Sequence, residues 1–583
     1  MLATQLFTRK LRHHNVGACS IWGLPMTNFA DASNYPYRPG SLFLGLDDDG
    51  FEVGVETERH AITIAGAGSG KGACLLIPNA RRWPHNLLVV DPKGENAAAS
   101  WEAREALGQK VCILDPFKVA EVPERLRATV NLLADLDPNG WTVAEDIKAI
   151  ADGLVKRSDP KHEEWDKGAV SLLAGLMAYV VAEAPAEKKT LLMVREMLTQ
   201  PNAALYEDAQ RMIACAASGG LAKAGGVGIM TAIESEKGME KDFLAAARRH
   251  TEWMDSLPMQ TILGTSSFSL SELKTGDVSV FLVLPPQYLD THATFLRVFV
   301  RTAINAMAAG GSGKGKRCLF LLDEFFTLGR MDEIAKAAGL MRSYGVHLWP
   351  FLQDIGQLRT LYGPELSETF FGNSDAHIFF GNTDSGTLSY VSTQLGDVGT
   401  AELSAPPEKQ AFQPKFWSET DWGELNAVGK QKKEEWDTKE ENKHRQYQHE
   451  MSKVGKNRYP PDKVRSMVAK TGNSPVAKNM IVFAKGGDVL LLKLAPYFYT
   501  IPKSISPAYI TKAETIPSLS KVQKPFYKVR QFLLLGLGII FLLATIIGIA
   551  NPNPSTGEPP QPFLSFVVSA GAFWLYSRER KKK

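Results

Sequence analysis

The 583-residue chain has few cysteines, and its five thiols lie far apart at Cys19, Cys74, Cys112, Cys215 and Cys318. None belongs to a C-x-x-C pair or has a histidine nearby at metal-ligand spacing, so we expect no zinc site. Three of them, Cys74, Cys112 and Cys318, lie in apolar surroundings that are typical of core cysteines. The pattern indicates a protein of a reducing compartment.

The chain also lacks a strong net charge, because 66 Lys and Arg against 63 Asp and Glu leave only +3. No overall basic character therefore indicates nucleic acid, and any DNA path must be a local ring of Lys and Arg. The N-terminus lacks the apolar core of a signal peptide, so we expect the bulk of the chain not to be translocated. At this length, at least two folding units are expected.

Two long apolar runs lie near the C-terminus, at Phe532–Ala550 and Phe563–Tyr576. Lys and Arg flank both runs, and their connection carries a single charge, Glu558. This predicts a transmembrane hairpin with both flanks in the cytoplasm. The second run is about 14 residues and would span about 21 Å as a helix, so it could cross or be re-entrant. A buried core helix is the alternative for each run.

A glycine-rich loop follows the apolar run that begins at Ile62. Its glycines allow successive N–H groups to converge on an anion, Lys71 supplies a charge for the β- and γ-phosphates, and a helix through Leu76 adds its positive end. Pro78 is expected to end or kink that helix. The loop departs from the usual P-loop pattern twice, with Ala65 in place of the first glycine and no Mg²⁺-binding hydroxyl after the lysine. A simple glycine-rich turn is the alternative. The predicted nucleotide-binding residues are Gly66, Ala67, Gly68, Ser69, Gly70, Lys71 and Gly72.

A second apolar run, Cys318–Leu322, ends in two carboxylates, which is typical of a Walker B strand. Asp323 is predicted to hold the water shell of Mg²⁺, and Glu324 to act as the general base that activates water near the γ-phosphate of ATP. Gln353, at the end of a later predicted strand, is a candidate sensor of the γ-phosphate; a turn-forming polar residue is the alternative. The pairing of this run with the Lys71 loop favours an ATPase over an incidental turn.

Short apolar runs separated by helix-length segments predict an α/β fold with a mainly parallel sheet. Ligands bind at the carboxyl ends of such strands, so the Asp91–Glu95 turn is expected near the nucleotide. There Lys93 or Glu95 could contact nucleotide or a neighbouring subunit, although a simple turn is an equal interpretation. The predicted strands are 61–65, 86–91, 110–115, 278–284, 318–322, 347–353, 376–381, 480–484 and 489–494.

Between residues 131 and 270 the pattern becomes helical, and a capping box at Thr142-x-x-Glu145 opens it. This predicts a helical insertion between the two nucleotide-binding elements, whose role is either packing or substrate gating. Another helix is predicted at Glu333–Tyr344. The predicted organisation is an N-terminal segment 1–55, the motor in parts 56–130, 271–400 and 471–505, the all-α insertion 131–270, a polar insertion 401–470, a linker 506–530, the hairpin 531–577 and a basic tail 578–583.

The motifs together resemble the TraG/TraD group of type IV secretion coupling proteins, over roughly residues 40–500. The resemblance rests on Gly70-Lys71-Gly72 and on four stretches in this order: Asp91–Glu95, Leu322–Gly329, Arg342–Gly345 and Gln353–Gly363. It implies a RecA-like motor, an all-α insertion and a homohexamer with ATP between subunits. It also implies that Lys-Gly is an accepted P-loop ending and that Arg342 is a trans-acting arginine finger. The group usually carries its membrane segments before the motor, whereas here they follow it.

The leading hypothesis is an inner-membrane ATPase with its motor in the cytoplasm, using ATP and Mg²⁺. By resemblance, it would pass relaxase-bound single-stranded DNA, or an effector protein, to type IV secretion channel proteins during conjugation. Two alternatives remain: a nucleotide-binding recruitment platform with little turnover, and a DNA translocase for chromosome segregation.

Overall fold

The computed structural model describes residues 29–500, except 157–162, 236–237, 314, 332–333, 335–340, 398–433, 440, 444, 447–456 and 473. All of the described residues belong to one compact unit that extends to Pro502. The predicted linker, the hairpin runs Phe532–Ala550 and Phe563–Tyr576, and the basic tail lie outside the described residues. Most of the predicted helix 333–344 also lies outside them.

The described residues form one sheet of eleven strands in the order β2-β1-β11-β10-β9-β3-β8-β7-β4-β6-β5. From β9 to β5 every neighbouring pair is parallel, and the remaining pairs, from β2 to β9, are antiparallel. The predicted α/β fold with a mainly parallel sheet is therefore confirmed. The strands are β1 Leu42–Leu46, β2 Glu52–Val55, β3 His60–Ala65, β4 Asn86–Asp91, β5 Lys110–Leu114, β6 Val278–Val283, β7 Cys318–Leu322, β8 Val346–Leu352, β9 Ser374–Phe380, β10 Asn479–Ala484 and β11 Val489–Lys493.

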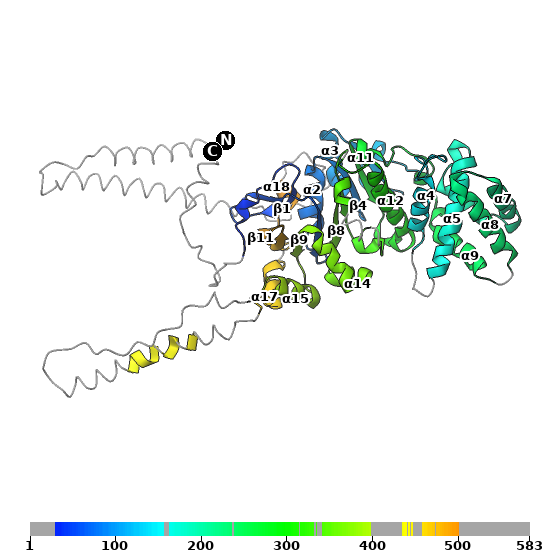
Figure 1. Cartoon of the computed structure of the whole chain (residues 1–583). Helices are drawn as coiled ribbons and strands as arrows, with labels where there is room; N and C mark the ends of the chain where they lie inside the picture. Colours follow the sequence, from blue (N-terminus) through cyan, green and yellow to red (C-terminus); the bar gives the residue numbers. More distant parts are fainter. Residues whose placement is uncertain are drawn as a thin grey trace, which may run out of the picture. The chain divides into compact units, whose positions relative to one another are not determined.

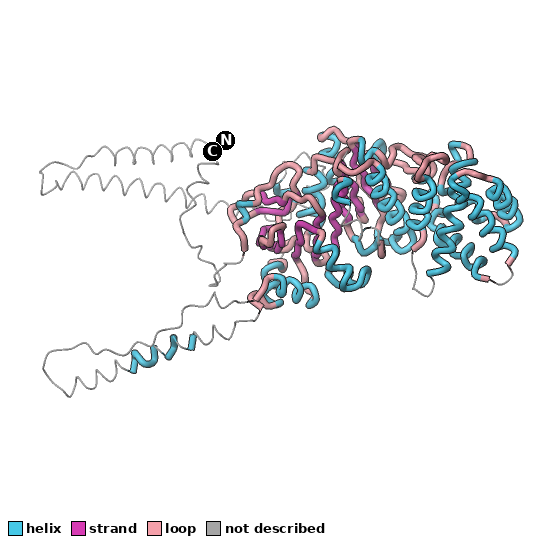
Figure 2. Tube along the Cα trace, viewed as in Figure 1, coloured by secondary structure: helices cyan, strands magenta, loops and turns pink. Residues whose placement is uncertain are grey.

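The central strands are covered on both faces. Every residue of β3, β4, β6, β7 and β8 is buried, as expected for parallel strands between layers of helices. Figure 2 shows the strands gathered together with helices around them. The helices outside the insertion are α2 Ile77–Arg82, α3 Glu95–Ala106, α11 Glu272–Thr275, α12 Leu289–Ala309, α14 Ile355–Gly372, α15 Ser385–Gln394, α17 Pro461–Val468 and α18 Tyr497–Thr500.

The helix after the glycine-rich loop does not end at Pro78. A π-helix, η2 (Gly72–Leu76), passes directly into α2, in which Pro78 occupies one of the first two positions. Proline is tolerated there because the first N–H groups of an α-helix have no partner within it. Pro78 therefore marks a change from π to α geometry, and the helix continues to Arg82.

Within the described part of residues 131–270 every regular element is a helix, as the sequence predicted. Thr142 precedes the first helix but makes no capping hydrogen bond, so the predicted capping box is wrong. Its hydroxyl donates instead to Asp146, one helical turn away, at 2.9 Å. The helices are α4 Val143–Leu154, α5 Glu163–Glu183, α6 Leu191–Thr199, α7 Asn202–Ala214, α8 Leu221–Glu234, α9 Met239–Thr251 and α10 Leu257–Leu263.

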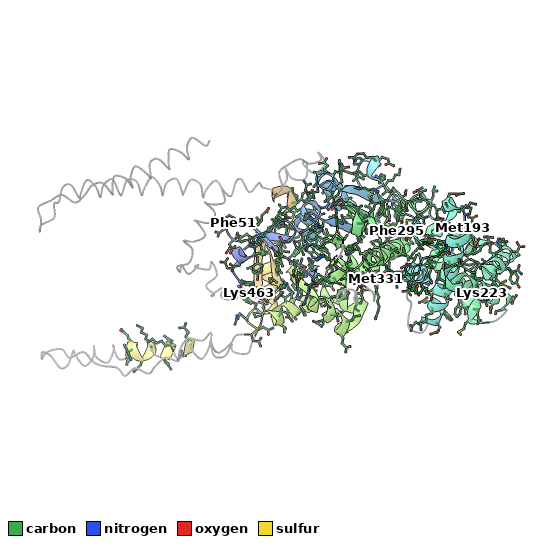
Figure 3. All side chains as sticks on the ribbon, turned by 45° about the horizontal axis from the view of Figure 1, so that its top comes forward. Phe51, Met193, Lys223, Phe295, Met331 and Lys463 are labelled. Atoms are coloured by element: carbon green, nitrogen blue, oxygen red, sulfur yellow. The ribbon has the colours of Figure 1, made fainter. Side chains whose placement is uncertain are left out.

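The insertion is joined to the rest of the unit by α4 and α12, which lie between the strands and the α5, α7, α8 and α9 cluster in Figure 1. Arg297 on α12 donates from Nε to the carbonyl of Gly153 on α4 at 2.9 Å. Trp253 of the insertion packs on Phe295, labelled in Figure 3, with 6.2 Å between ring centroids. This contact is both apolar and hydrogen-bonded.

Among the described helices, α5 is long and apolar enough to cross a membrane by length and composition. Within its apolar window, 61% is buried inside the protein, as in the core helix of a folded domain. A second candidate exists only if α7 and the bent segment 218–234 count as one span. The described residues thus supply weak evidence for a membrane segment.

Candidate functional site

Five neighbouring strands of the sheet, in the order β9-β3-β8-β7-β4, bring their carboxyl ends to one edge. The glycine-rich loop follows β3, Gln353 follows β8, and Asp323 and Glu324 follow β7. Because β8 lies between β3 and β7, the glutamine stands between the loop and the two carboxylates. The parallel topology thus brings together segments that are almost 300 residues apart in sequence.

The loop Gly66–Gly70 is held tightly where it leaves the sheet. A Cβ added at Gly66 would lie 2.1 Å from the carbonyl oxygen of Gly381, so no side chain fits there. Gly70 has φ +106°, a backbone region closed to most residues, and a Cβ on it would meet Val476 at 2.6 Å. Among the described residues, the N–H groups of Ala67, Gly68 and Gly70 have no hydrogen-bond acceptor. The loop is therefore fixed in shape while keeping donors available for an anion.

Lys71 lies between the loop and the β7 carboxylates. Its ammonium donates to the carbonyl of Ala65 at 3.2 Å and lies 3.9 Å from Oε1 of Glu324. Its side chain is only 10% exposed, so the charge is partly shielded from water. Lys71 is thus held at the strand ends, where an anion on the loop would compete with Glu324 for it.

Glu324 adopts a left-handed backbone conformation, with φ +50° and ψ +46°. Few residues other than glycine adopt this conformation, which costs on the order of 1 kcal/mol or more and is common at functional sites. Gln353 donates from Nε2 to both carboxylate oxygens of Glu324, at 3.3 and 3.2 Å. The predicted base and sensor are therefore in direct contact, together with the P-loop lysine.

Asp323 and Asp91 end the adjacent strands β7 and β4. Burial, followed by the charge of Glu324, raises the pKa of Asp323 to about 6, while the ammonium groups of Lys71 and Lys93 act to lower it. Burial is also the main cause that raises the pKa of Asp91 to about 7, and the charge of Asp323 contributes. These two carboxyls form an acidic pair that a nearby cation would stabilise in the ionised state.

The Asp91–Glu95 segment forms the turn that opens α3. Asp91 accepts from the N–H of Ala97 at 2.8 Å and from the amide of Asn96 at 3.2 Å, and Gly94 donates back to its carbonyl. Lys93 is exposed, and its charge reaches Asp323. Asp91 therefore stabilises the turn, as the simple-turn interpretation predicts. Lys93 lies close enough to the carboxyl edge for its charge to act on Asp323.

Arg342 is not part of this cluster. It lies in a short 3₁₀ helix, η10 (Met341–Tyr344), before β8, and forms an ion pair with Glu58, which precedes β3. Both residues are therefore at the amino ends of their strands. β8 has seven residues, so about 20 Å of strand separates Arg342 from Gln353. Arg342 is therefore too far from the carboxyl edge of its own chain to act there.

Two polar residues at this edge, Asn382 and Lys470, were not predicted, and Ser69 was predicted only as a member of the loop. Asn382 follows β9, is buried, donates to the carbonyl of Gln353 at 3.5 Å and leaves its Oδ1 without a partner. Ser69, named only as a loop member, also has a buried hydroxyl without a partner. Lys470 lies over the loop at Gly68. The strand-end rule could have found Asn382, but no signal in the polar segment indicates Lys470.

Residues 461–468, which composition groups with the polar segment 401–470, form α17, which packs against α15 and β10. Gly381, at the end of β9, donates to the carbonyl of Val468 at 2.9 Å. This part of the polar segment thus lies beside the candidate site.

A cavity of about 730 Å³ lies elsewhere, where the insertion meets the start of α12. Its lining includes Trp165, Arg249, His250, Asp290 and His292. None of the predicted site residues lines it, and its charged groups carry both signs. It leaves the role of the insertion, packing or gating, open.

Taken together, the edge combines free backbone donors, a lysine and three carboxylates with a bridging amide. Free N–H groups and a lysine bind a phosphate group, and adjacent carboxylates can hold a hydrated Mg²⁺ and accept a proton from water. The buried, unpartnered Ser69 hydroxyl and Asn382 carbonyl leave polar atoms for such a ligand. The residues present therefore fit a magnesium nucleotide.

Comparison with known families gives a match over most of the described residues. The sequence model of the family described as "Type IV secretory system Conjugative DNA transfer" matches residues 28–413. A probable conjugal transfer protein TraG of Sinorhizobium fredii is 30% identical over 376 residues, which are 63% of this chain and 56% of that protein. The coupling protein VirD4 of Bartonella quintana is 26% identical over 318 residues, 54% of this chain and 49% of that protein. The chain spans about half the length of the curated relatives it matches.

Solved structures of the conjugative coupling protein TrwB share the fold. An unbound form has a TM-score of 0.54 at 14% identity and covers 83% of this chain and 97% of its own. A complex of TrwB with ADP and Mg²⁺ has a TM-score of 0.52 at 14% identity, with the same coverages. At this identity the likeness establishes the fold of a TrwB-like protein.

Proposed function

The chain belongs to the family of type IV secretory system proteins for conjugative DNA transfer, and we propose that it is an ATPase of the coupling-protein type. It uses ATP hydrolysis to recruit relaxase-bound single-stranded DNA, or an effector protein, and to pass it to the channel proteins of a type IV secretion system. The observation that carries the proposal is the contact of Lys71, Glu324 and Gln353 at one sheet edge.

In this reaction the loop amides and Lys71 bind the phosphates of ATP. Glu324 accepts the proton of the water that attacks the γ-phosphorus, and Gln353 positions that water and the carboxylate. Asp323 would hold Mg²⁺ through its water shell, and the ion would supply charge neutralisation on the phosphates. Because position 72 is glycine, the loop itself would add no side-chain hydroxyl to that site. ADP and Mg²⁺ bound to TrwB support the same cofactors here.

The approach of ATP releases Lys71 from Glu324. In the described state the lysine lies 3.9 Å from that carboxylate, and only Ala65 otherwise accepts from it. A γ-phosphate is the stronger partner for the ammonium because it carries more charge. The Glu324 carboxylate then keeps its hydrogen bonds from Gln353 and can accept one from water, as a general base requires.

The motor is RecA-like and works as a homohexamer in which Arg342 reaches the nucleotide of the neighbouring subunit. Its place at the amino ends of the strands supports a role in trans, because its own nucleotide edge is about 20 Å away. Such an arginine stabilises charge on the transferred phosphoryl group and couples neighbouring sites.

The anchor in this proposal is the hairpin of Phe532–Ala550 and Phe563–Tyr576, in the bacterial inner membrane, with the motor in the cytoplasm. Basic residues on both flanks and their scarcity in the connection support this orientation. The DNA path is a local lining of Lys and Arg in the hexamer, so DNA binding weakens as salt is added.

The test is ATP hydrolysis by the full-length chain in detergent, with and without single-stranded DNA, and with Lys71→Ala as the blank. We expect DNA to stimulate hydrolysis, and Lys71→Ala to reduce both rates to the background. Lys478→Ala is the matched control, because this lysine is exposed and adjoins Ala477, which donates to the loop at Ser69.

Hydrolysis that DNA does not change would overturn the DNA motor in favour of a protein cargo. Nucleotide binding without hydrolysis by confirmed hexamers would support the recruitment platform instead. Activity that survives Lys71→Ala would remove the loop from the site. A chromosome-segregation translocase would be favoured by stimulation with duplex DNA only.

A further inference from the structure

The segment that follows α17 forms a hydrogen bond with the glycine-rich loop. Residues 468–478, apart from 473, are here called the strap. Ala477 donates to the carbonyl of Ser69 at 2.9 Å, and Lys478 donates to that of Ala469 at 3.0 Å, which folds the strap back on itself. Lys470 and Ala477 form an antiparallel bridge across it. The strap therefore bonds to the loop at Ala477, and the pair of Lys478 and Ala469 closes the strap on itself.

The strap also shapes the loop by packing. Val476 occupies the space in which a side chain at Gly70 would stand, because a Cβ built there would lie 2.6 Å from its Cγ1. At the other end, the N–H of Gly381 donates to the carbonyl of Val468 at 2.9 Å. The carbonyl oxygen of Gly381 lies so close to Gly66 that a Cβ on Gly66 would be 2.1 Å from it. The loop, the end of β9 and the strap thus support one another.

This arrangement holds one lysine of the strap over the loop. The Nζ atom of Lys470 lies 3.7 Å from the position of a Cβ on Gly68, and it is the one described atom within 4 Å of that position. The side chain is exposed and forms no ion pair or hydrogen bond with a described residue. The neighbouring Ala67, Gly68 and Gly70 also have free N–H donors.

We propose that Lys470 is a second phosphate-binding lysine of this site, which contacts the phosphates of a nucleoside di- or triphosphate from the Gly68 side of the loop. The proposal rests on the proposed nucleotide site. Lys71 reaches the same phosphates from the β7 side, where it competes with Glu324. A nucleotide on the loop would therefore lie between two ammonium groups, one from the motor and one from the strap.

A second cation also suits the chemistry of the loop. Position 72 has no hydroxyl, so the loop offers one protein ligand fewer for holding a magnesium nucleotide, and a direct contact to the phosphates would add to that hold. A lysine is suited to the task, because its ammonium acts as a point charge on a flexible stem and can follow the phosphates. Figure 3 labels Lys463 on α17, the helix that leads directly into the strap.

The test is direct binding of fluorescent ADP and ATP analogues, with Mg²⁺, to the full-length chain in detergent. Lys470→Ala should raise both dissociation constants about tenfold, as expected for the loss of one charge-assisted contact. Lys470→Arg should restore most of the affinity, because it keeps the charge. Lys478→Ala, from the same strap and also exposed, should bind as the unaltered chain does.

The outcomes separate this proposal from the proposed function. If the unaltered chain binds neither nucleotide, the proposed nucleotide site is wrong, and the proposed role of Lys470 is overturned as well. If the unaltered chain binds and Lys470→Ala binds equally well, only the role of Lys470 is overturned. If Lys470→Ala weakens binding but also lowers the thermal unfolding midpoint, and Lys470→Arg rescues neither, the lysine supports the strap and the proposal is overturned.

Discussion

Both ends of the central strands carry buried polar side chains, but the groups that surround these side chains differ. At the amino ends, Asn86 accepts from Val278 at 3.0 Å and donates to Leu273 at 2.8 Å, and His60 accepts from Leu348 at 3.0 Å. At the carboxyl ends, Ser69 and Asn382 keep buried polar atoms without partners, and so do Thr57 and Trp83 near the amino ends of β3 and β4. The carboxyl edge differs because free N–H groups of the glycine-rich loop accompany its unpartnered atoms.

Backbone strain follows the same division. Glu324, at the carboxyl end of β7, is left-handed at φ +50°. At the amino edge, His60 and Asn86 lie in regular strands. Since buried polar groups in proteins are nearly always paired, an unpaired group together with a strained residue indicates a place kept for a ligand. A buried polar atom without a partner does not by itself distinguish function from structure, since Thr57 and Trp83 also have one. Its combination with a strained residue and free loop N–H groups does.

The largest expected effect comes from Glu324→Gln at the carboxyl edge. A glutamine keeps the shape and can still pair with Gln353, but it cannot accept a proton. We therefore expect the turnover number for ATP to fall by about 10²- to 10⁴-fold, with the dissociation constant for ATP nearly unchanged. Steady-state hydrolysis and nucleotide binding by the full-length chain measure the two quantities.

Glu365→Gln is the control for this variant, since Glu365 is an exposed carboxylate on α14. It should change neither quantity. Unchanged turnover in Glu324→Gln would show that this residue is not the base. The thermal unfolding midpoint should stay the same or rise slightly, because the variant removes one charge from a strained position.

The next effect is expected at the amino edge, where Asn86→Ala should act on stability. The side chain is fully buried, and its loss leaves the N–H of Val278 and the carbonyls of Leu273 and Gly276 without their partner. Each unsatisfied buried group costs about 1 to 3 kcal/mol, so we expect a loss of about 3 kcal/mol. Urea unfolding of the full-length chain measures it.

The comparison requires that Asn86→Ala leave catalysis alone. Below its unfolding transition, the variant should hydrolyse ATP at the unaltered rate. Asn139→Ala, in an exposed turn, is the matched control and should change neither stability nor rate. A large loss of turnover in well-folded Asn86→Ala would break the division between the two edges.

The sequence indicated most of the sheet, because parallel strands buried on both faces read as continuous apolar runs. β4 was predicted with the observed bounds, Asn86–Asp91, and the glycine-rich loop and Asp323-Glu324 were predicted to share an edge. Topology explains this success, since the carboxyl ends of parallel strands must lie together. Only the short β1 and β2 escaped a clear prediction.

What the sequence could not indicate depends on contacts across long separations. Lys470 lies about 400 residues after Gly68, in a segment whose composition predicted a surface insertion. The predicted capping box at Thr142 was wrong because several hydrogen-bond partners lie within reach of the hydroxyl. In the structure the hydroxyl donates to Asp146. The distance of Arg342 from the nucleotide edge of its own chain also required the register of β8.

The smallest effect is expected at the carboxyl edge, from Gly72→Ser. A Cβ at Gly72 would meet nothing within 4 Å, so the fold has room for the hydroxyl that P-loops usually carry there. We expect stability to change by less than about 0.5 kcal/mol. The added ligand should lower the Mg²⁺ concentration for half-maximal hydrolysis by about two- to tenfold, a shift that a Mg²⁺ titration measures.

Two further variants decide what such a shift means. Gly72→Ala adds the Cβ without the hydroxyl and should leave the Mg²⁺ titration unchanged. Gly70→Ser should instead damage binding, because position 70 has φ +106° and a Cβ there would meet Val476 at 2.6 Å. If Gly72→Ser has no effect, Asp323, the phosphates and water already complete the magnesium shell. In that case the absence of a hydroxyl at position 72 leaves no coordination position of the magnesium ion empty. The unpartnered Ser69 and Asn382 atoms are then the remaining groups for the nucleotide to satisfy.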